Sequence, residues 1–453
     1  MLDYKTQLLR SVAAACLVAL PLWAGPAQSM TLKEAVEIAI TTNPEVGSVA
    51  NNRRAIDEEL RQGRALYLPQ VDIRAATGPE FSDNVTVEAR GKDNITLLRK
   101  EGSATLSQLL FDGFFADSEV EKQIARVESA AHRVNEASEF TGLDAVESYL
   151  EVLRHRARVE IAENNVAVHR QRLDQVRARA DAGGGNIADV RQAEARLSNA
   201  ESSLNQVRGD LKDAEALFIR VVGQAPDTLE DPTVPADSIP PDVESAVAIA
   251  IENSPTIQFA RADVKAAEAD IKQQNASLYP DIRLELGGSI NDDIDGRRDT
   301  EYDATALVVM RYNLYRGGAD VARIREFKYR QAEALDRLRV NERKVAEDTR
   351  VSWNAMEVSH NNVEILRREV DANEKTRDVY KQQFEIGQRG LLDLLDADNE
   401  LFLARDSLVT AEYTELFANY RLLASQGALQ KSLGLTPVAA ANPQAAESWS
   451  PFD

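Results

Sequence analysis

Cysteine is nearly absent from this chain of 453 residues: the only one is Cys16, in an apolar segment near the N-terminus. A single cysteine cannot form a disulfide framework within one chain. The four histidines form neither a His-Glu-x-x-His motif nor a Cys/His cluster, and no Gly-x-Ser-x-Gly motif is present. These absences argue against a zinc enzyme and against an α/β hydrolase. We therefore predict that the protein is not an enzyme and has no cofactor.

One acidic segment, residues 291–296, superficially resembles a calcium-binding loop. The twelfth position of such a loop must be a glutamate that binds the ion through both oxygens, and here it is Tyr302. We therefore expect an acidic surface hairpin and no metal site.

Positive charge is in deficit relative to negative charge. The chain has 53 lysines and arginines but 74 aspartates and glutamates, which gives a formal net charge of −21. Aromatic residues make up only 6% of the chain, which is low for a compact globular enzyme. A chain this acidic repels nucleic acid, so we exclude DNA and RNA as partners. It would favour cations in any pore that it lines.

Long apolar runs are missing beyond the N-terminus, which predicts that the chain has no transmembrane helix. The N-terminus itself has the form of a secretory signal peptide over residues 1–27. Lys5 and Arg10 precede a short apolar run, and small residues lead to a cleavage site after Ala27. A short membrane anchor and lipidation at Cys16 stay open as alternatives. A secreted protein without a transmembrane helix is periplasmic, extracellular or an outer-membrane barrel.

What the chain does contain is an internal duplication. Ala-Val-Glu-Ile-Ala-Ile at 35–40 returns as Ala-Val-Ala-Ile-Ala-Ile at 246–251, and further landmarks follow in the same order in both halves. We predict one repeat over 28–226, an extended proline-rich linker over 227–241, and a second repeat over 242–436. The Ala-, Pro- and Ser-rich tail, 437–453, is expected to be disordered.

Each half should begin with a short helix and a second helix that a proline starts, followed by two strands. Residues 70–74 and 281–286 alternate polar and apolar side chains, which is typical of strands between two environments. The stretches 116–182 and 319–386 contain no proline and only one glycine, Gly142, so each predicts a helix about 100 Å long. Such helices need partners along their whole length, and coiled-coil packing is the usual solution.

The segments that follow the long helices carry the heptads that such packing requires. Apolar residues step by three and four along the first of them: Val190, Ala193, Leu197, Ala200, Leu204, Val207, Leu211, Ala214, Phe218 and Val221. Small alanines in this seam allow close approach of the helices. Four strands per chain, in contrast, cannot close a barrel in a membrane, so the strands must be pooled between chains; three chains would give twelve.

With these features the chain resembles the TolC-like outer membrane factor family over nearly all of its mature length. The resemblance rests on the duplicated plan and on short motifs: Asn43-Pro44, Ser254-Pro255, Leu68-Pro69, Phe111-Asp112-Gly113 and Gly-Gln-Arg-Gly-Leu-Leu-Asp-Leu-Leu-Asp-Ala at 387–397. It implies a mixed fold class of α-helical coiled coils and transmembrane β-strands. A trimeric 12-stranded β-barrel, four strands per chain, would be continuous with a long periplasmic α-helical barrel.

The resemblance also implies a function: an outer-membrane channel-tunnel, in contact with outer-membrane lipid, that exports substrates from an inner-membrane pump. A periplasmic adaptor protein would join the homotrimer to an ABC transporter or another pump. The Phe-Asp-Gly-Phe segment at 111–114 favours type I protein secretion. Efflux of drugs or other small molecules is the alternative, and a periplasmic coiled-coil adaptor that transports nothing is a second one.

In that family the turn between the inner helices forms a gate, and four charged residues match its motif: Asp189, Arg389, Asp393 and Asp396. Asp393 and Asp396 lie about one helical turn apart, so both can face a pore and favour cations. Arg389 and Asp189 lie at corresponding ends of the two halves. We expect a charge-assisted bond between them that holds the resting gate.

Two further residues lie in the vicinity of this gate, Phe384 and Gly387. Phe384 stands where relatives often have tyrosine, so a hydroxyl-mediated bond is not expected there. The glycines 183–185 predict a looser turn in the first half than is usual for the family.

Overall fold

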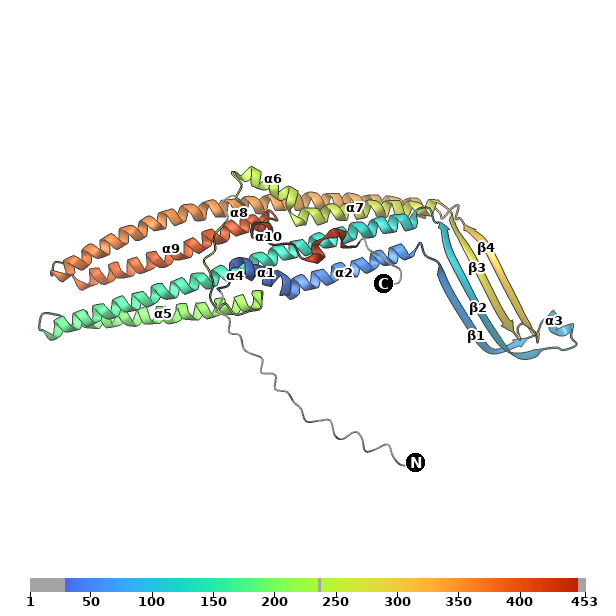
Figure 1. Cartoon of the computed structure of the whole chain (residues 1–453), viewed down its shortest axis with the longest axis horizontal. Coiled ribbons are helices and arrows are strands. Elements are labelled where there is room, and N and C mark those ends of the chain that lie inside the picture. Colours follow the sequence, from blue (N-terminus) through green and yellow to red (C-terminus); the bar gives the residue numbers. More distant parts are fainter. Residues whose placement is uncertain (1–28, 235–237, 447–453) are drawn as a thin grey trace, which may run out of the picture.

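The computed structural model of the protein describes residues 29–234 and 238–446, so the predicted signal peptide with Cys16 and residues 447–453 lie outside the described residues. The molecule is elongated. Long helices run along one axis, and a four-stranded sheet bends away from them at one end (Figure 1). In the described part of the chain, no helix has the length and apolar character needed to cross a membrane.

Two successions of the same elements make up the chain. The first is α1 (Leu32–Thr42), α2 (Pro44–Ala65), β1 (Gln70–Ser82), β2 (Ile95–Phe111), α4 (Phe115–Asp181) and α5 (Ile187–Val222), with the short α3 (Val85–Glu88) between its strands. The second is α6 (Val243–Asn253), α7 (Pro255–Asn275), β3 (Asp281–Asp292), β4 (Thr300–Arg311), α8 (Ala319–Glu385) and α9 (Leu391–Ser425). This order confirms the predicted duplication. The 67-residue helices α4 and α8 confirm the predicted long helices.

Local sequence explains where several helices begin. The Thr31 hydroxyl accepts a bond from the amide of Glu34 (3.2 Å), and the Glu34 carboxylate accepts one from the amide of Thr31 (2.9 Å), which forms a capping box before α1. Pro44 and Pro255 occupy the first turns of α2 and α7, where a missing N–H removes no helical bond. The predicted helix starts at these prolines are therefore confirmed.

The sheet is antiparallel in the order β1-β2-β3-β4, so the pairing of β2 with β3 joins the two halves. One face is apolar, as in the row that pairs Val71 with Leu106 and Leu106 with Leu286. The other face is polar, as in the neighbouring row that pairs Asp72 with Thr105. Among the residues that the structure describes, β1 and β4 each keep one edge without a partner strand.

The corner between β2 and α4 is built by the Phe-Asp-Gly-Phe segment. The Asp112 carboxylate accepts bonds from the amides of Phe115 (3.0 Å) and Ala116 (2.8 Å) at the start of α4. Gly113 has φ 69°, and a Cβ there would lie 2.6 Å from Cβ of Tyr279. Only glycine fits this position, because any side chain would meet both a strained backbone and the segment that joins α7 to β3.

Two buried tyrosines tie the segment between the halves to the helices. The Tyr149 hydroxyl on α4 donates to the carbonyl oxygens of Met30 (2.8 Å) and Glu230 (2.7 Å). The Tyr420 hydroxyl on α9 donates to the carbonyl oxygen of Thr233 (3.2 Å). The N-terminal end of the described chain and the segment after α5 are therefore held side by side in the middle of the helical body.

The C-terminal segment departs from expectation. Residues 439–446 form two short 3₁₀ turns, Ala439–Ala441 and Pro443–Ala446, which pack against α4 and, through the first turn, α2. Arg53 on α2, which is almost fully buried, donates to the carbonyl oxygen of Asn442 (3.4 Å). The prediction of a disordered tail is wrong for these residues, because small alanines allow the chain to lie close against the helices.

Glu139 on α4 holds the short helix α10 (Leu429–Ser432) in place. Its carboxylate is almost fully buried and accepts bonds from the amides of Leu429 (3.1 Å) and Gln430 (3.3 Å) and from the Gln430 side chain (3.1 Å). Burial raises the pKa of Glu139 to about 7, although these bonds act in the opposite direction.

This raised pKa predicts a specific pH dependence of stability. Because the pKa of Glu139 is about 7 when folded and near its ordinary 4.5 when unfolded, stability should fall as the pH rises between these values. Glu139→Gln keeps a neutral group there, so its melting temperature should change less between about pH 5 and about pH 7 than that of the wild type. Glu136→Gln, one turn earlier, is the control and should follow the wild type. Equal pH dependence in all three proteins would contradict the prediction.

Candidate functional site

The end of the molecule opposite the sheet consists of two helix turns, one from each half (Figure 1). Residues 182–186 connect α4 to α5, and residues 386–390 connect α8 to α9. Gly387 has φ 75°, and its amide donates to the carbonyl oxygen of Phe384 (3.0 Å). Gly183 has φ 77° and donates to Ala180 in the same way (3.0 Å). The two turns therefore end their long helices with the same backbone geometry at the first glycine.

Arg389 is bound to its own helical hairpin. Its Nε donates to Oε1 of Gln383 (2.8 Å), and its Nη1 lies 3.4 Å from Oδ2 of Asp393. The guanidinium also lies over the ring of Tyr380, 3.6 Å from the ring centre. These three contacts fix the arginine at the tip of the α8–α9 pair.

The other two acidic residues of the predicted gate have different surroundings. Asp396, which is half exposed, binds Arg196 on α5 (2.6 Å) and so joins the two halves. Asp189, in the first turn of α5, is partly buried and has no ion-pair partner among the described residues. Within one chain, Arg389 and Asp189 form no ion pair; the acidic partner of the arginine is Asp393 on the same hairpin. Asp393 and Asp396 both stay about half exposed, and each is paired with an arginine.

Phe384 contributes an apolar contact at this end. It packs against a buried cluster from both halves that includes Val176 on α4 and Leu395 on α9. The guanidinium of Arg179 lies 5.9 Å from the centre of its ring. At this position the ring therefore connects the two helix pairs through packing, without the hydroxyl that a tyrosine would add.

Above the turns, three arginine–aspartate pairs join the first half to α9. Arg158 binds Asp406 (2.8 Å), and Arg172 binds Asp398 (2.9 Å); Arg196–Asp396 is the third. In every pair the arginine comes from α4 or α5 and the aspartate from α9. These charges hold α9 in a fixed position along the first half.

The Arg172–Asp398 pair is the buried one, with side-chain exposures of 5% and 2%. His169, also buried, lies one turn before Arg172, and burial lowers its pKa, so it is neutral in the folded protein near neutral pH. Asp398 Oδ1 and His169 Nδ1 are both buried without a hydrogen-bond partner among the described residues. Sequence analysis missed this pair because its members are 226 residues apart and each resembles an ordinary charge on a helix surface.

Comparison with known proteins places these features in a family. The model of the family described as "Outer membrane efflux protein" matches residues 35–224 and 246–428, which is most of the chain. The two matched segments fall in the two halves of the structure.

Named relatives match along most of their length. The chain is 32% identical to outer membrane efflux protein BepC of Brucella suis biovar 1, over 92% of this chain and 90% of that protein. It is 22% identical to outer membrane protein TolC of Escherichia coli, over 89% and 83% of the two chains. It is also 22% identical to the alkaline protease secretion protein AprF of Pseudomonas aeruginosa, over 89% and 86%.

Solved structures share the fold. The structure of CusC, described in terms of transmembrane channel formation, superimposes with a TM-score of 0.74 over 89% of this chain and 92% of that one, at 16% identity.

The buried pair generates a prediction about stability. Asp398→Ala leaves the charge of Arg172 buried without a partner, so it should destabilise the protein by about 3–5 kcal/mol. The double variant Arg172→Met/Asp398→Leu replaces both charges by apolar groups and should cost much less. Thermal unfolding of the purified protein, with hydrogen exchange along α9 as the local measurement, compares the two.

Asp371→Ala, which removes an exposed pair with Lys375 one turn further along α8, is the matched control and should change little. If Asp398→Ala melts no earlier than this control, the pair does not hold α9.

Proposed function

The chain belongs to the outer membrane efflux protein family, whose members are outer-membrane channels and not enzymes, and from this premise we propose that three copies form one export duct. In the proposed trimer the four strands of each chain contribute to a single 12-stranded barrel in the outer membrane. The long helices extend this barrel into the periplasm as a tunnel.

The observation that carries the proposal is the amphipathic sheet with two open edges. A strand edge in a membrane must find a partner, because no water is present there to bind its N–H and C=O groups. The edges of β1 and β4 satisfy each other if β4 of one copy pairs with β1 of the next. The apolar face then contacts lipid, and the polar face lines the channel.

Helix α8 supports the same assembly. Within this fully described helix, no residue before Val345 is buried, and Val321, Tyr329 and Val340 expose apolar side chains. Its counterpart α4 is buried at many positions along its length. The exposed part of α8 lies on the same side as the open edge of β4, so a neighbouring copy would cover both.

We propose that the cargo is a protein exported by type I secretion. The Phe-Asp-Gly-Phe segment and the relative named as a protease secretion protein support this proposal. Small-molecule efflux is the second candidate, because the relative with 32% identity is named an efflux protein. A strain that lacks the protein separates them: loss of a secreted protein from the medium supports the first, and increased drug sensitivity alone supports the second.

The proposed partners are a periplasmic adaptor and an inner-membrane pump, which would engage the end formed by the two helix turns. In this arrangement the turns constrict the duct when no pump is bound. Asp189, Arg389, Asp393 and Asp396 are the proposed gate and selectivity residues, with Phe384 and Gly387 beside them.

The assembly and its selectivity can be tested on one preparation. Detergent-purified protein should have the mass of three chains, and in planar bilayers it should pass cations in preference to chloride. Asp393→Ala/Asp396→Ala should weaken this preference, because it removes two carboxylates per chain from the entrance. A stable monomer would contradict the proposed trimer. Unchanged selectivity would show that Asp393 and Asp396 do not line the pore.

The proposed gate leads to a separate prediction about conductance. In the closed trimer, Arg389 of one copy is proposed to reach Asp189 of its neighbour in competition with Asp393. One exposed pair contributes only about 0.2–1 kcal/mol, but three copies together could bias a gate by about 1–3 kcal/mol. Asp189→Ala and Arg389→Ala should each raise the single-channel conductance, and the double variant should add little. Arg191→Ala, an exposed arginine near the same turn, is the control and should leave the conductance unchanged.

If neither Asp189→Ala nor Arg389→Ala alters the conductance, this pair does not hold the gate closed.

A further inference from the structure

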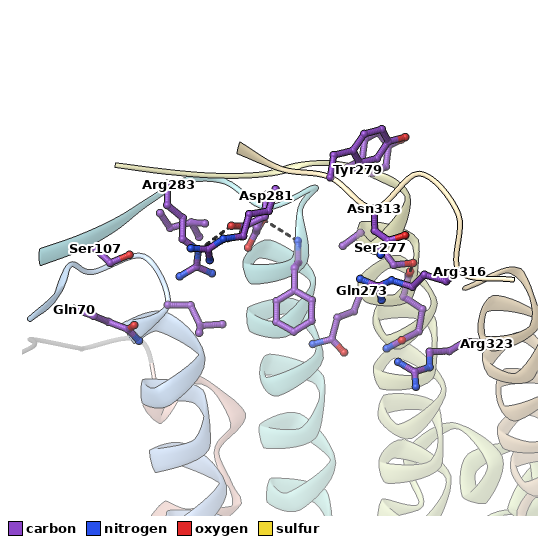
Figure 2. A pocket seen from close by; sticks show the side chains of 18 of the residues that line it. Gln70, Ser107, Gln273, Ser277, Tyr279, Asp281, Arg283, Asn313, Arg316 and Arg323 are labelled. Atoms are coloured by element: carbon purple, nitrogen blue, oxygen red, sulfur yellow. Dashed lines mark hydrogen bonds and ion pairs between the residues drawn. The ribbon is translucent and has the colours of Figure 1, made fainter. Parts of the chain in front are cut away.

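A cavity of about 660 Å³ lies in the corner between the sheet and the helices (Figure 2). The ends of α2 and α7, the beginnings of α4 and α8, and the strand ends nearest to the helices surround it. The strand residues that line it belong to the polar face, since Gln70 pairs with Ser107 and Asp281 pairs with Arg311 in the sheet. The cavity therefore opens on the side of the sheet opposite to the apolar face.

The charge of this lining is opposite to that of the chain. In a protein with a net charge of −21, the cavity is lined by two aspartates, Asp112 and Asp281, and by four arginines: Arg283, Arg311, Arg316 and Arg323. Both aspartates are already engaged. Asp112 caps α4, and Asp281 accepts from Nε of Arg283 (2.9 Å).

The arginines, in contrast, keep most of their donors. Each guanidinium has five N–H groups. Arg311 binds Glu285 through Nη2 (3.0 Å), and Arg316 has only a long contact with Asp320 (3.6 Å). Arg323 has no acidic partner among the residues that the structure describes.

Arg316 and Arg323 lie on the same side of the cavity. Arg316 lies in the connection between β4 and α8, and Arg323 lies in the first turns of α8; Figure 2 shows both on the side that faces α7, near Gln273 and Ser277. Gln273 and Ser277 are neutral, so they add polar groups without compensating the positive charge. Planar guanidinium groups with free donors match the oxygens of phosphate and carboxylate.

We propose that this cavity is a binding site for oxyanions, namely phosphate or carboxylate groups of dissolved solutes, with Arg316 and Arg323 as its principal ligands. The proposal rests on the proposed function in one respect: the polar face of the sheet is the one that lines the duct. The solute is a dissolved one and not a lipid headgroup, because lipid contacts the opposite, apolar face. Three such sites would surround the duct where the barrel joins the tunnel.

Calorimetric titration of inorganic pyrophosphate into the detergent-purified, full-length protein tests the site. The wild type should bind, and Arg316→Gln/Arg323→Gln should weaken the affinity about tenfold or more, because two charge-assisted contacts are lost. Arg368→Gln is the matched control, since Arg368 is an exposed arginine of α8 beyond Val345 and outside the cavity. Absence of binding to the wild type, or equal affinity of wild type and double variant, overturns the proposal.

A second arm distinguishes the source of the anion. The titration is repeated in vesicles of phosphatidylcholine and in vesicles that also contain phosphatidylglycerol. Equal pyrophosphate affinity in both supports a site for dissolved anions, and loss of binding in the anionic vesicles would assign the cavity to lipid headgroups. Mass and conductance of the same preparations test the duct independently, so a monomer that still binds pyrophosphate contradicts the trimer and not the site.

Discussion

The close packing of α4 is the constraint on which the rest of the structure depends. This helix contacts α1, α2, α5, α7 and α9 along its length. Gly142 shows how near they come, because a Cβ there would lie 3.4 Å from Cγ1 of Val36 on α1 and 3.5 Å from Cδ2 of Leu429 on α10. With 67 residues, this helix separates the sheet from the turns by about 100 Å.

Ion pairs then fix the position of one helix along another, which apolar packing alone leaves undetermined. A heptad seam in which alanine and larger apolar residues recur at the same spacing does not by itself fix the position of one helix along another, because a shift by one repeat keeps apolar contacts. The arginines on α4 and α5 and the aspartates on α9 pair in only one register, and Arg172–Asp398 does so where water is excluded. A buried ion pair adds little to stability compared with apolar packing, but it penalises every alternative alignment.

Regular features of this fold could be predicted from the sequence, and features that depend on distant residues could not. The long helices follow from the missing prolines, the strands from alternation, and the turn at Gly387 from its glycine. The partners of Arg389 and Asp398 depend instead on which helices become neighbours. Local sequence also favoured disorder after Pro437, whereas the alanines at 439–441 pack on α2 and α4. For the proposed gate, motif similarity indicated candidate residues but did not specify their bonds within one chain.

The middle of the helical body brings together the two ends of the described chain. Lys33 donates to the carbonyl oxygen of Gly434 (3.0 Å), 401 residues later, and Glu139 binds the start of α10, 290 residues later. Such contacts give this region a very high contact order, and loop closure over these distances is slow. A chain that crosses a membrane from its N-terminus therefore cannot complete its midsection until almost all of it has been translocated. Its strands must be kept from aggregating during that interval, which makes biogenesis, and not final stability, the step that most needs assistance.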